Sequence, residues 1–190
     1  MAAVRLLALA SLAQIGFLSA KRATPSGGPR RLSAADGRYS RHASELIYRP
    51  GRYDDNPDYK YMKRFSYKIF VAVDPKAPPG EAVAGEVLWR MAQGTPDVVL
   101  NKINKSRQEA VVVYIGTVNV LPTWQNNRVG STMLPKALDT IRDEVPNVMA
   151  AYLGVSKGNT YAIKLYQKTN FTCVHGNGDS SLFCVYLYLQ

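Results

Sequence analysis

The sequence has few of the residues on which metal sites and disulfide-rich folds depend. Its 190 residues include 2 cysteines and 2 histidines, without the spacing of a metal-binding motif. Neither a P-loop nor a nucleophile elbow is present, so the motifs of nucleotide hydrolases and serine hydrolases are missing. Cys173 and Cys184 flank a glycine-containing turn and are predicted to be cross-strand neighbours, with free buried thiols as the expected state. The sequence therefore predicts no metal and no disulfide framework.

Acidic residues are also scarce, with 14 Asp and Glu against 24 Lys and Arg and a net charge of +10. Most of the excess lies in residues 1–66, which hold 12 basic and 5 acidic residues. Arginines there alternate with Tyr39, Tyr48 and Tyr53, and basic charge with aromatic rings is typical of proteins that bind single-stranded nucleic acid. Because these residues precede the globular pattern, we interpret them as a solvated leader and do not expect nucleic acid as the main partner.

The N-terminal region has no apolar stretch long enough to span a membrane. The uncharged residues 6–20 match the apolar region of a signal peptide in length, and the Arg- and Ser-rich residues 21–45 are typical of an organelle transit peptide. The alternative is that residues 1–20 form a first strand or helix, followed by a flexible basic linker. We expect residues 1–47 to be a targeting or flexible segment and residues 48–190 to be one domain. The expected location is the cytoplasm, or an organelle if the first segment is a targeting signal.

Hydrophobic periodicity predicts an alternation of strands and helices after the leader, with an irregular stretch at 92–109. The predicted elements are a short helix at 59–65, a hairpin of strands 67–74 and 82–91, a strand at 110–121, a helix at 129–145, a strand at 148–156, a helix at 160–170 and a final hairpin around a Gly-Asn-Gly-Asp turn. This order predicts an α/β fold in which helices flank a mixed sheet, with the strand 110–121 at its centre. The part before residue 67 is poorly defined.

One stretch, residues 114–134, passes from a β-branched strand through Pro122 to a polar, glycine-bearing turn and then to a helical pattern. A turn between a strand and a helix N-terminus exposes backbone NH groups and the positive end of the helix dipole, which together favour an anion. In sheets of this kind such sites lie beyond the carboxyl end of a central strand. The sequence therefore predicts a pyrophosphate site at residues 125–131.

Three blocks of the sequence resemble the GNAT superfamily of acetyl-CoA-dependent N-acyltransferases, in the family's order. Residues 118–122 resemble the strand end whose backbone meets the pantetheine arm and thioester. Residues 125–130 resemble the Q/R-x-x-G-x-G/A loop that holds the pyrophosphate, and residues 159–171 resemble the second CoA-contacting helix, with its Asn, Ala-Ile, Leu-Tyr, Lys and Phe. The resemblance covers roughly residues 67 to 190 and implies a mostly antiparallel, GNAT-like sheet.

The resemblance implies an enzyme that moves an acetyl group from acetyl-CoA to a primary amine by direct attack in a ternary complex. Acetyl-CoA is the implied cosubstrate, and the acceptor is an unidentified amine of a small molecule or a protein. The implied cofactor-binding residues are Val118, Val120, Gln125, Asn126, Asn127, Arg128, Val129, Gly130, Ser131, Asn159, Tyr166 and Lys168. Two alternatives stay open at this point: a GNAT-like protein that binds acyl-CoA without catalysis, and a basic nucleic-acid-binding module.

Acetyl transfer to an amine requires a polarised carbonyl, a neutral amine and a protonated leaving thiolate. The resemblance assigns protonation of the thiolate to Tyr166 and polarisation of the carbonyl to backbone NH groups near Val118 and Val120. Tyr114 is the first candidate for relaying the amine proton, and Glu86 is the second. Strand alternation predicts that Tyr114, Gly116, Val118 and Val120 lie on one face of the sheet.

Four residues depart from the family pattern. Arg128 replaces the first glycine of the loop, and we interpret its guanidinium as a partial substitute for a backbone contact. Asn170 replaces the glycine before Phe171, and Pro135 is expected to kink the first turns of its helix. Gly154 lies where amino-terminal acetyltransferases of the superfamily carry a histidine, so a proton path through water is favoured over a Tyr/His pair.

Overall fold

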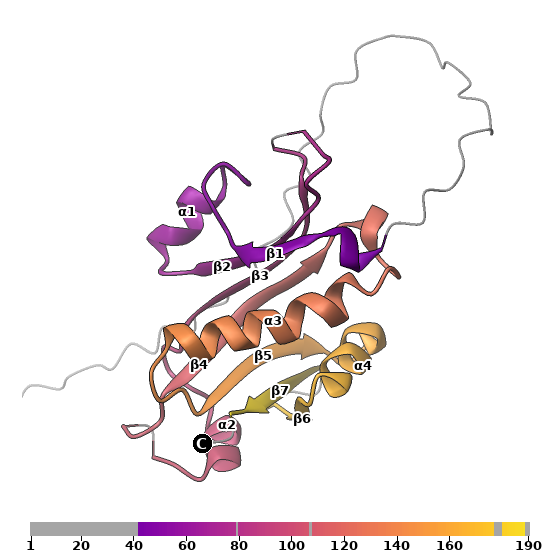
Figure 1. Ribbon diagram of the computed structural model, residues 1–190. Coiled ribbons are helices and arrows are strands. Elements are labelled where there is room, and N and C mark those ends of the chain that lie inside the picture. Colours follow the sequence, from indigo (N-terminus) through magenta and orange to yellow (C-terminus); the bar gives the residue numbers. More distant parts are fainter. Residues whose placement is uncertain (1–41, 79, 107, 177–179, 189–190) are drawn as a thin grey trace, which may run out of the picture. The chain divides into compact units, whose positions relative to one another are not determined.

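A computed structural model describes residues 42–78, 80–106, 108–176 and 180–188, all of which belong to one compact unit (Figure 1). The predicted leader therefore lies, up to residue 41, outside the described residues. The last residues of that predicted segment, 42–47, are described and include regular structure, beginning with the 3-10 turn Ala43–Glu45. Ala43 and Leu46 are buried against the main core, and Lys76 forms an ion pair with Glu45 at 3.0 Å.

Seven strands form one sheet in the order β1-β2-β3-β4-β5-β7-β6. Every neighbouring pair is antiparallel except β4 and β5, which are parallel. The strands are β1 (Ile47–Pro50), β2 (Lys68–Val73), β3 (Val83–Met91), β4 (Val112–Val120), β5 (Ala150–Ser156), β6 (Thr172–His175) and β7 (Ser181–Leu187). The sheet is thus mixed and mostly antiparallel, with β4 in the middle position, as the sequence predicted.

In the described part of the chain, four α-helices cover the two faces of this sheet. The helices are α1 (Tyr59–Arg64), α2 (Asp97–Ile103), α3 (Val129–Glu144) and α4 (Thr160–Lys168), and a 3-10 turn, η2 (Pro122–Trp124), precedes α3. Buried residues of α3 and α4 pack with alternate residues of the central strands in the largest cluster. Residues of α1 and α2 pack with the strand residues of the opposite face in two smaller clusters. In Figure 1, α3 crosses the sheet and α4 lies beside the β5–β7 end.

Two elements, helix α2 and strand β1, were not predicted. Helix α2 lies within the stretch expected to be irregular, with Pro96 at its N-cap and with Val99 and Leu100 buried; Val99 packs with strand residues. Strand β1 lies in the part before residue 67, for which the sequence predicted no strand, and its Pro50 is tolerated at the end of an edge strand. Helix α3 continues from Val129 to Glu144 with Pro135 inside it, on the exposed side.

The two cysteines were expected to be free thiols, and this expectation is wrong. Cys173 of β6 and Cys184 of β7 are register partners in the antiparallel pair and form a disulfide. Their symmetric spacing around the turn predicted that they would be neighbours. Whether two neighbouring thiols are joined depends on the directions of their Cβ atoms, which the spacing does not give.

A bulge in β4 separates the residues that alternation had placed on one face. Ile115 pairs with Trp89 and Thr117 pairs with Leu88, so Gly116 is left without a partner on β3. After this extra residue, alternation resumes in the opposite sense. Tyr114 therefore packs in the cluster on the α2 face, whereas Val118 and Val120 pack against the cluster on the α3 face. The expectation of a common face for these residues is wrong.

Strands β4 and β5 pair over a short distance and then separate. Their register extends from Val112 and Ala150 to Tyr114 and Tyr152, although β4 continues to Val120. Strand β5 stays paired with β7 over its whole length. The second half of β4 therefore has one paired edge, toward β3, and one edge without a strand partner.

Candidate active site

The edge of β4 that faces away from β3 presents backbone groups for a ligand. The NH of Leu121 donates to the carbonyl oxygen of Ala84, at 2.9 Å, on the β3 side. Because successive residues of a strand direct their NH and C=O groups to opposite edges, those of Val120 and Val118 point toward the open edge. The Gln125 side chain reaches this edge from the next turn, where its Nε2 donates to the Val120 oxygen at 3.0 Å.

The turn between η2 and α3 contains a row of backbone donors without protein acceptors. Asn126 and Arg128 adopt left-handed conformations, with φ of 63° and 61°, and Arg128 is the N-cap of α3. Within the described part of the chain, the NH groups of residues 126–131 donate to no acceptor. A concave row of NH groups at a helix N-terminus favours a phosphate anion.

Arg128 lies where the loop motif has its first glycine, and its backbone keeps the conformation that glycine allows. Its φ of 61° and ψ of 10° fall in the left-handed region, which a residue with a Cβ adopts at a cost of roughly 1–2 kcal/mol. Arg128 is exposed and lines the same cavity as the free NH groups. The residue thus has a backbone conformation that glycine allows and brings a positive charge to the turn.

We expect Arg128→Gly to raise the free energy of unfolding of the ligand-free protein by about 1 kcal/mol, because glycine adopts the left-handed conformation without strain. Urea denaturation measures this change. Arg128→Ala is the matched control, since it removes the same charge and leaves the Cβ in place. An equal gain in both variants would show that charge, and not backbone strain, causes the effect.

Two neighbouring cavities lie between the open edge of β4, the turn and α4. The first, here called the loop cavity, has a volume of about 310 Å³ and is lined by residues 124–131, excluding Asn127, and by one side of α4. The second, the strand cavity, has a volume of about 360 Å³ and extends from Val118 to Asn159 and Tyr166. Of the residues predicted to bind the cofactor, all except Asn127 line one of these two cavities. The Asn127 side chain instead donates to the carbonyl oxygen of Gln125, at 3.0 Å.

The loop cavity is positively charged. Arg128 of the turn and Lys164 and Lys168 of α4 line it, and no carboxylate is among its described lining residues. Tyr161 connects its two sides, because the tyrosine hydroxyl donates to Oδ1 of Asn126 at 3.3 Å. Asn159 caps α4 by accepting from the NH of Ala162 at 3.1 Å, so the first turn of this helix is held against the cavity.

Several lining residues were missed by the sequence analysis. Tyr161, Lys164 and Leu165 line the loop cavity together with Lys168. These positions have the spacing i, i+3, i+4 and i+7, which places them on one face of a helix. That periodicity was the signal from which they were predictable. Trp124 of η2 and Asn119 of β4 also line the cavities, without a comparable signal.

Tyr166 has the environment of a neutral proton donor. Burial raises the pKa of its hydroxyl, which therefore keeps its proton at neutral pH. The ring packs at 5.8 Å from the ring of Phe171, and the residue lines the strand cavity. Its hydroxyl donates to no acceptor among the described residues, so it is free to bond to a ligand atom.

Tyr114 lies at the point where β4 and β5 separate, but on the other face of the sheet. Its ring centroid is 5.2 Å from that of Tyr152, its register partner. Burial and the neighbouring Tyr67 raise the pKa of Tyr114, although Arg90 opposes the shift. The phenol is therefore neutral near pH 7, and it can relay a proton through hydrogen bonds but is not itself an anionic base.

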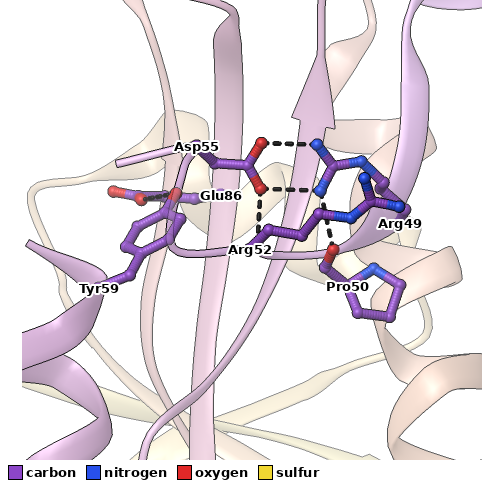
Figure 2. A network of polar contacts seen from close by, with 6 residues as sticks. All are labelled: Arg49, Pro50, Arg52, Asp55, Tyr59 and Glu86. Atoms are coloured by element: carbon purple, nitrogen blue, oxygen red, sulfur yellow. Dashed lines mark hydrogen bonds and ion pairs between the residues drawn. The ribbon is translucent and has the colours of Figure 1, made fainter. Parts of the chain in front are cut away.

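Glu86 of β3 forms a hydrogen bond with the first residue of α1, beside a group of polar contacts in the segment before that helix (Figure 2). The Tyr59 hydroxyl donates to Oε2 of Glu86 at 2.8 Å. Next to this pair, Asp55 accepts from the Arg49 guanidinium at 2.7 and 2.5 Å and from the Arg52 backbone NH at 2.6 Å. Desolvation raises the pKa of Asp55, but the hydrogen bond from Arg49 lowers it, and the net effect is a lowered pKa. The contacts of Asp55 hold the segment 49–55 together, and the bond from Tyr59 to Glu86 holds the first residue of α1 against β3.

The polar groups near the open edge come from both faces of the sheet. Glu86 is the register partner of Asn119, which lines the strand cavity. At Gly154 of β5 an added Cβ would meet no atom within 4 Å, so there is room for a side chain at this position. In the described ranges, no cluster of His, Cys, Asp or Glu is suited to a metal. No helix there has the length and apolarity needed to cross a membrane.

Comparisons with known proteins agree with this geometry. Residues 46–171 match the model of the acetyltransferase (GNAT) family. A comparison with curated protein sequences finds no significant match. Among solved structures, NAA60 of Arabidopsis thaliana in complex with acetyl-CoA is similar with a TM-score of 0.58 and 21% identity, over 75% of this chain and 98% of that one.

Two further structures share the fold. The NatC complex bound to Gag peptide and CoA is similar with a TM-score of 0.55 and 17% identity, over 77% of this chain and 99% of that one. The putative acetyltransferase yncA of Salmonella typhimurium, with its cofactor acetyl-CoA, has a TM-score of 0.51 and 14% identity, over 75% and 94% of the two chains.

Proposed function

Since the chain belongs to the acetyltransferase (GNAT) family, we propose that it transfers an acetyl group from acetyl-CoA to a primary amine by direct attack in a ternary complex. The observation that carries the proposal is the row of free NH groups at residues 126–131, next to a cavity lined by three cations. A pyrophosphate is the anion that such a row favours. The similar structures of NAA60 and yncA hold acetyl-CoA.

The open edge of β4 fits the remainder of acetyl-CoA. The backbone groups of Val118 and Val120 would bond to the amides of the pantetheine arm, in the manner of an added strand. The free NH groups of this edge would also polarise the thioester carbonyl. This assignment is supported by the separation of β4 from β5 after Tyr114, which leaves room for a ligand between the two strands.

The proton transfers require one donor and one acceptor. Tyr166 would donate to the leaving thiolate, because it lines the strand cavity with a neutral hydroxyl that has no protein partner in the described ranges. Glu86 would accept the amine proton, directly or through water, since its half-buried carboxylate lies beside Asn119 of the open strand. Tyr114 is the second candidate, as a relay.

Acetyl-CoA at about 100 times its Kd is expected to stabilise the fold by about 2.7 kcal/mol, because it binds the native state alone. A thermal scan with and without acetyl-CoA measures the stabilisation as a rise in Tm of several degrees. No change in Tm at millimolar acetyl-CoA or CoA would contradict the proposed cofactor site.

Mass spectrometry of amine mixtures incubated with acetyl-CoA and the protein tests the transfer itself. A rise in Tm without any acetylated amine would favour the alternative function, a GNAT-like protein that binds acyl-CoA without catalysis. Arg128 in place of the loop glycine and the absence of a histidine at Gly154 are the observations behind this alternative.

A further inference from the structure

We propose that the acceptor is a peptide amine followed by acidic residues, which bind in a third cavity beside α1. The inference rests on the acetyl transfer proposed above and names its acceptor class. This hollow, here called the α1 cavity, has a volume of about 940 Å³ and shares no lining residue with the loop and strand cavities. Its walls include Arg52, Tyr53, Tyr59, Lys63, Tyr67 and Lys68.

Two lining residues of the α1 cavity, Tyr59 and Tyr67, connect it to the open edge of β4. The Tyr59 hydroxyl donates a hydrogen bond to Glu86, whose register partner Asn119 lines the strand cavity. The Tyr67 ring lies over the bulge of β4, since an added Cβ at Gly116 would be 2.8 Å from a ring carbon of Tyr67. Glu86 therefore lies between the acceptor side and the acetyl-CoA side, at the place where an amine must lose its proton.

The charges of the α1 cavity favour an anionic ligand. Lys68 is neutralised by Glu144, with 2.7 Å between Nζ and Oε2. In the described ranges, Arg52 and Lys63 form no ion pair with a carboxylate. The one other acid of the lining is Asp54, which is exposed. Arg52 and Lys63 are thus two exposed cations that a carboxylate of the acceptor can reach.

The size of the cavity and its aromatic walls favour a peptide over a small amine. A volume of about 940 Å³ is at the upper end of the usual range for small-molecule sites, and a single amine group would fill little of it. Lys63 is held over the Tyr53 ring, with Nζ 5.3 Å from the ring centroid, so one cation is already oriented. Tyr53 of the cavity wall is exposed, and so is Tyr61 of α1, which does not line the cavity.

Three peptides with the same free N-terminal residue, followed by acidic, neutral or basic residues, test the inference. The wild-type protein is expected to acetylate the acidic peptide with the highest kcat/KM. Arg52→Glu combined with Lys63→Glu is expected to lower kcat/KM for the acidic peptide by about tenfold or more and to leave the neutral peptide unchanged. Lys102→Glu on α2 is a single charge reversal outside the cavity, with no expected effect, and each single variant, Arg52→Glu or Lys63→Glu, is compared with it.

Binding of a fluorescent acidic peptide to the CoA-saturated protein is the second measurement, and the double variant is expected to weaken it by a similar factor. If the wild type acetylates all three peptides equally, or if the variant keeps the wild-type preference, the inference is overturned and the proposed acetyl transfer stands. If no peptide is acetylated but the acidic peptide binds through Arg52 and Lys63, the proposed transfer fails and the anion site stands. Displacement of the acidic peptide by a tighter-binding single-stranded oligonucleotide would overturn the peptide assignment.

Discussion

Gly130→Glu is expected to abolish acetyl-CoA binding while the protein stays folded. Gly130 belongs to the first turn of α3 and lines the loop cavity. A glutamate there adds bulk and a negative charge where backbone NH groups would meet the pyrophosphate. An acidic side chain in the first turn of a helix interacts favourably with the helix dipole, so the fold itself is not destabilised by the charge. Isothermal titration calorimetry with acetyl-CoA measures the loss.

Gly130→Ala is the control for this substitution. An added Cβ would contact a methyl carbon of Leu165 at 3.2 Å, and the end of a leucine side chain can shift by a few tenths of an ångström. The alanine variant is therefore expected to bind acetyl-CoA with nearly the wild-type Kd and to show the same ligand-induced rise in Tm. Wild-type binding by the glutamate variant would place the pyrophosphate somewhere other than this turn.

Tyr166→Phe is expected to lower kcat by roughly 100-fold, the usual contribution of a positioned acid. Phenylalanine keeps the ring and its packing on Phe171 but removes the hydroxyl that would donate to the leaving thiolate. The Kd for acetyl-CoA and the Tm are expected to stay near the wild-type values, which separates a loss of chemistry from a loss of structure. An unchanged kcat would mean that the thiolate leaves without help from this side chain.

The pH dependence distinguishes the proton donor from the proton acceptor. Raising the pH supplies more neutral amine, so a variant that lacks the acceptor recovers activity, whereas Tyr166→Phe does not. Glu86→Gln, which keeps an oxygen that can accept from Tyr59, and Tyr114→Phe are the two variants to compare. Recovery at high pH is expected for Glu86→Gln. A normal rate at neutral pH in Glu86→Gln, together with a pH-rescued defect in Tyr114→Phe, would move the acceptor role to Tyr114.

The sequence alone determined the elements in which local chemistry suffices. The central strand, the α3 helix and the polar turn between them follow from hydrophobic period and from residues that tolerate left-handed backbone, such as Asn126. The free NH groups of residues 128–131 follow from the same local pattern, because the N-cap and first turn of any helix lack internal acceptors. The cofactor residues that the family resemblance implied, apart from Asn127, line two adjoining cavities.

Only the tertiary structure decided which residues meet across the sheet. The bulge at Gly116 reverses the alternation of β4 and puts Tyr114 and Val118 on opposite faces. Because helices cover both faces of the sheet, the sequence pattern of β4 does not mark where one extra residue is inserted. Tyr59 and Glu86, separated by 27 positions, form a hydrogen bond because α1 packs over β2 and β3. Contacts of this kind depend on strand register and helix packing. Register and packing are determined by the burial of many side chains together, and not by the two residues that form the contact.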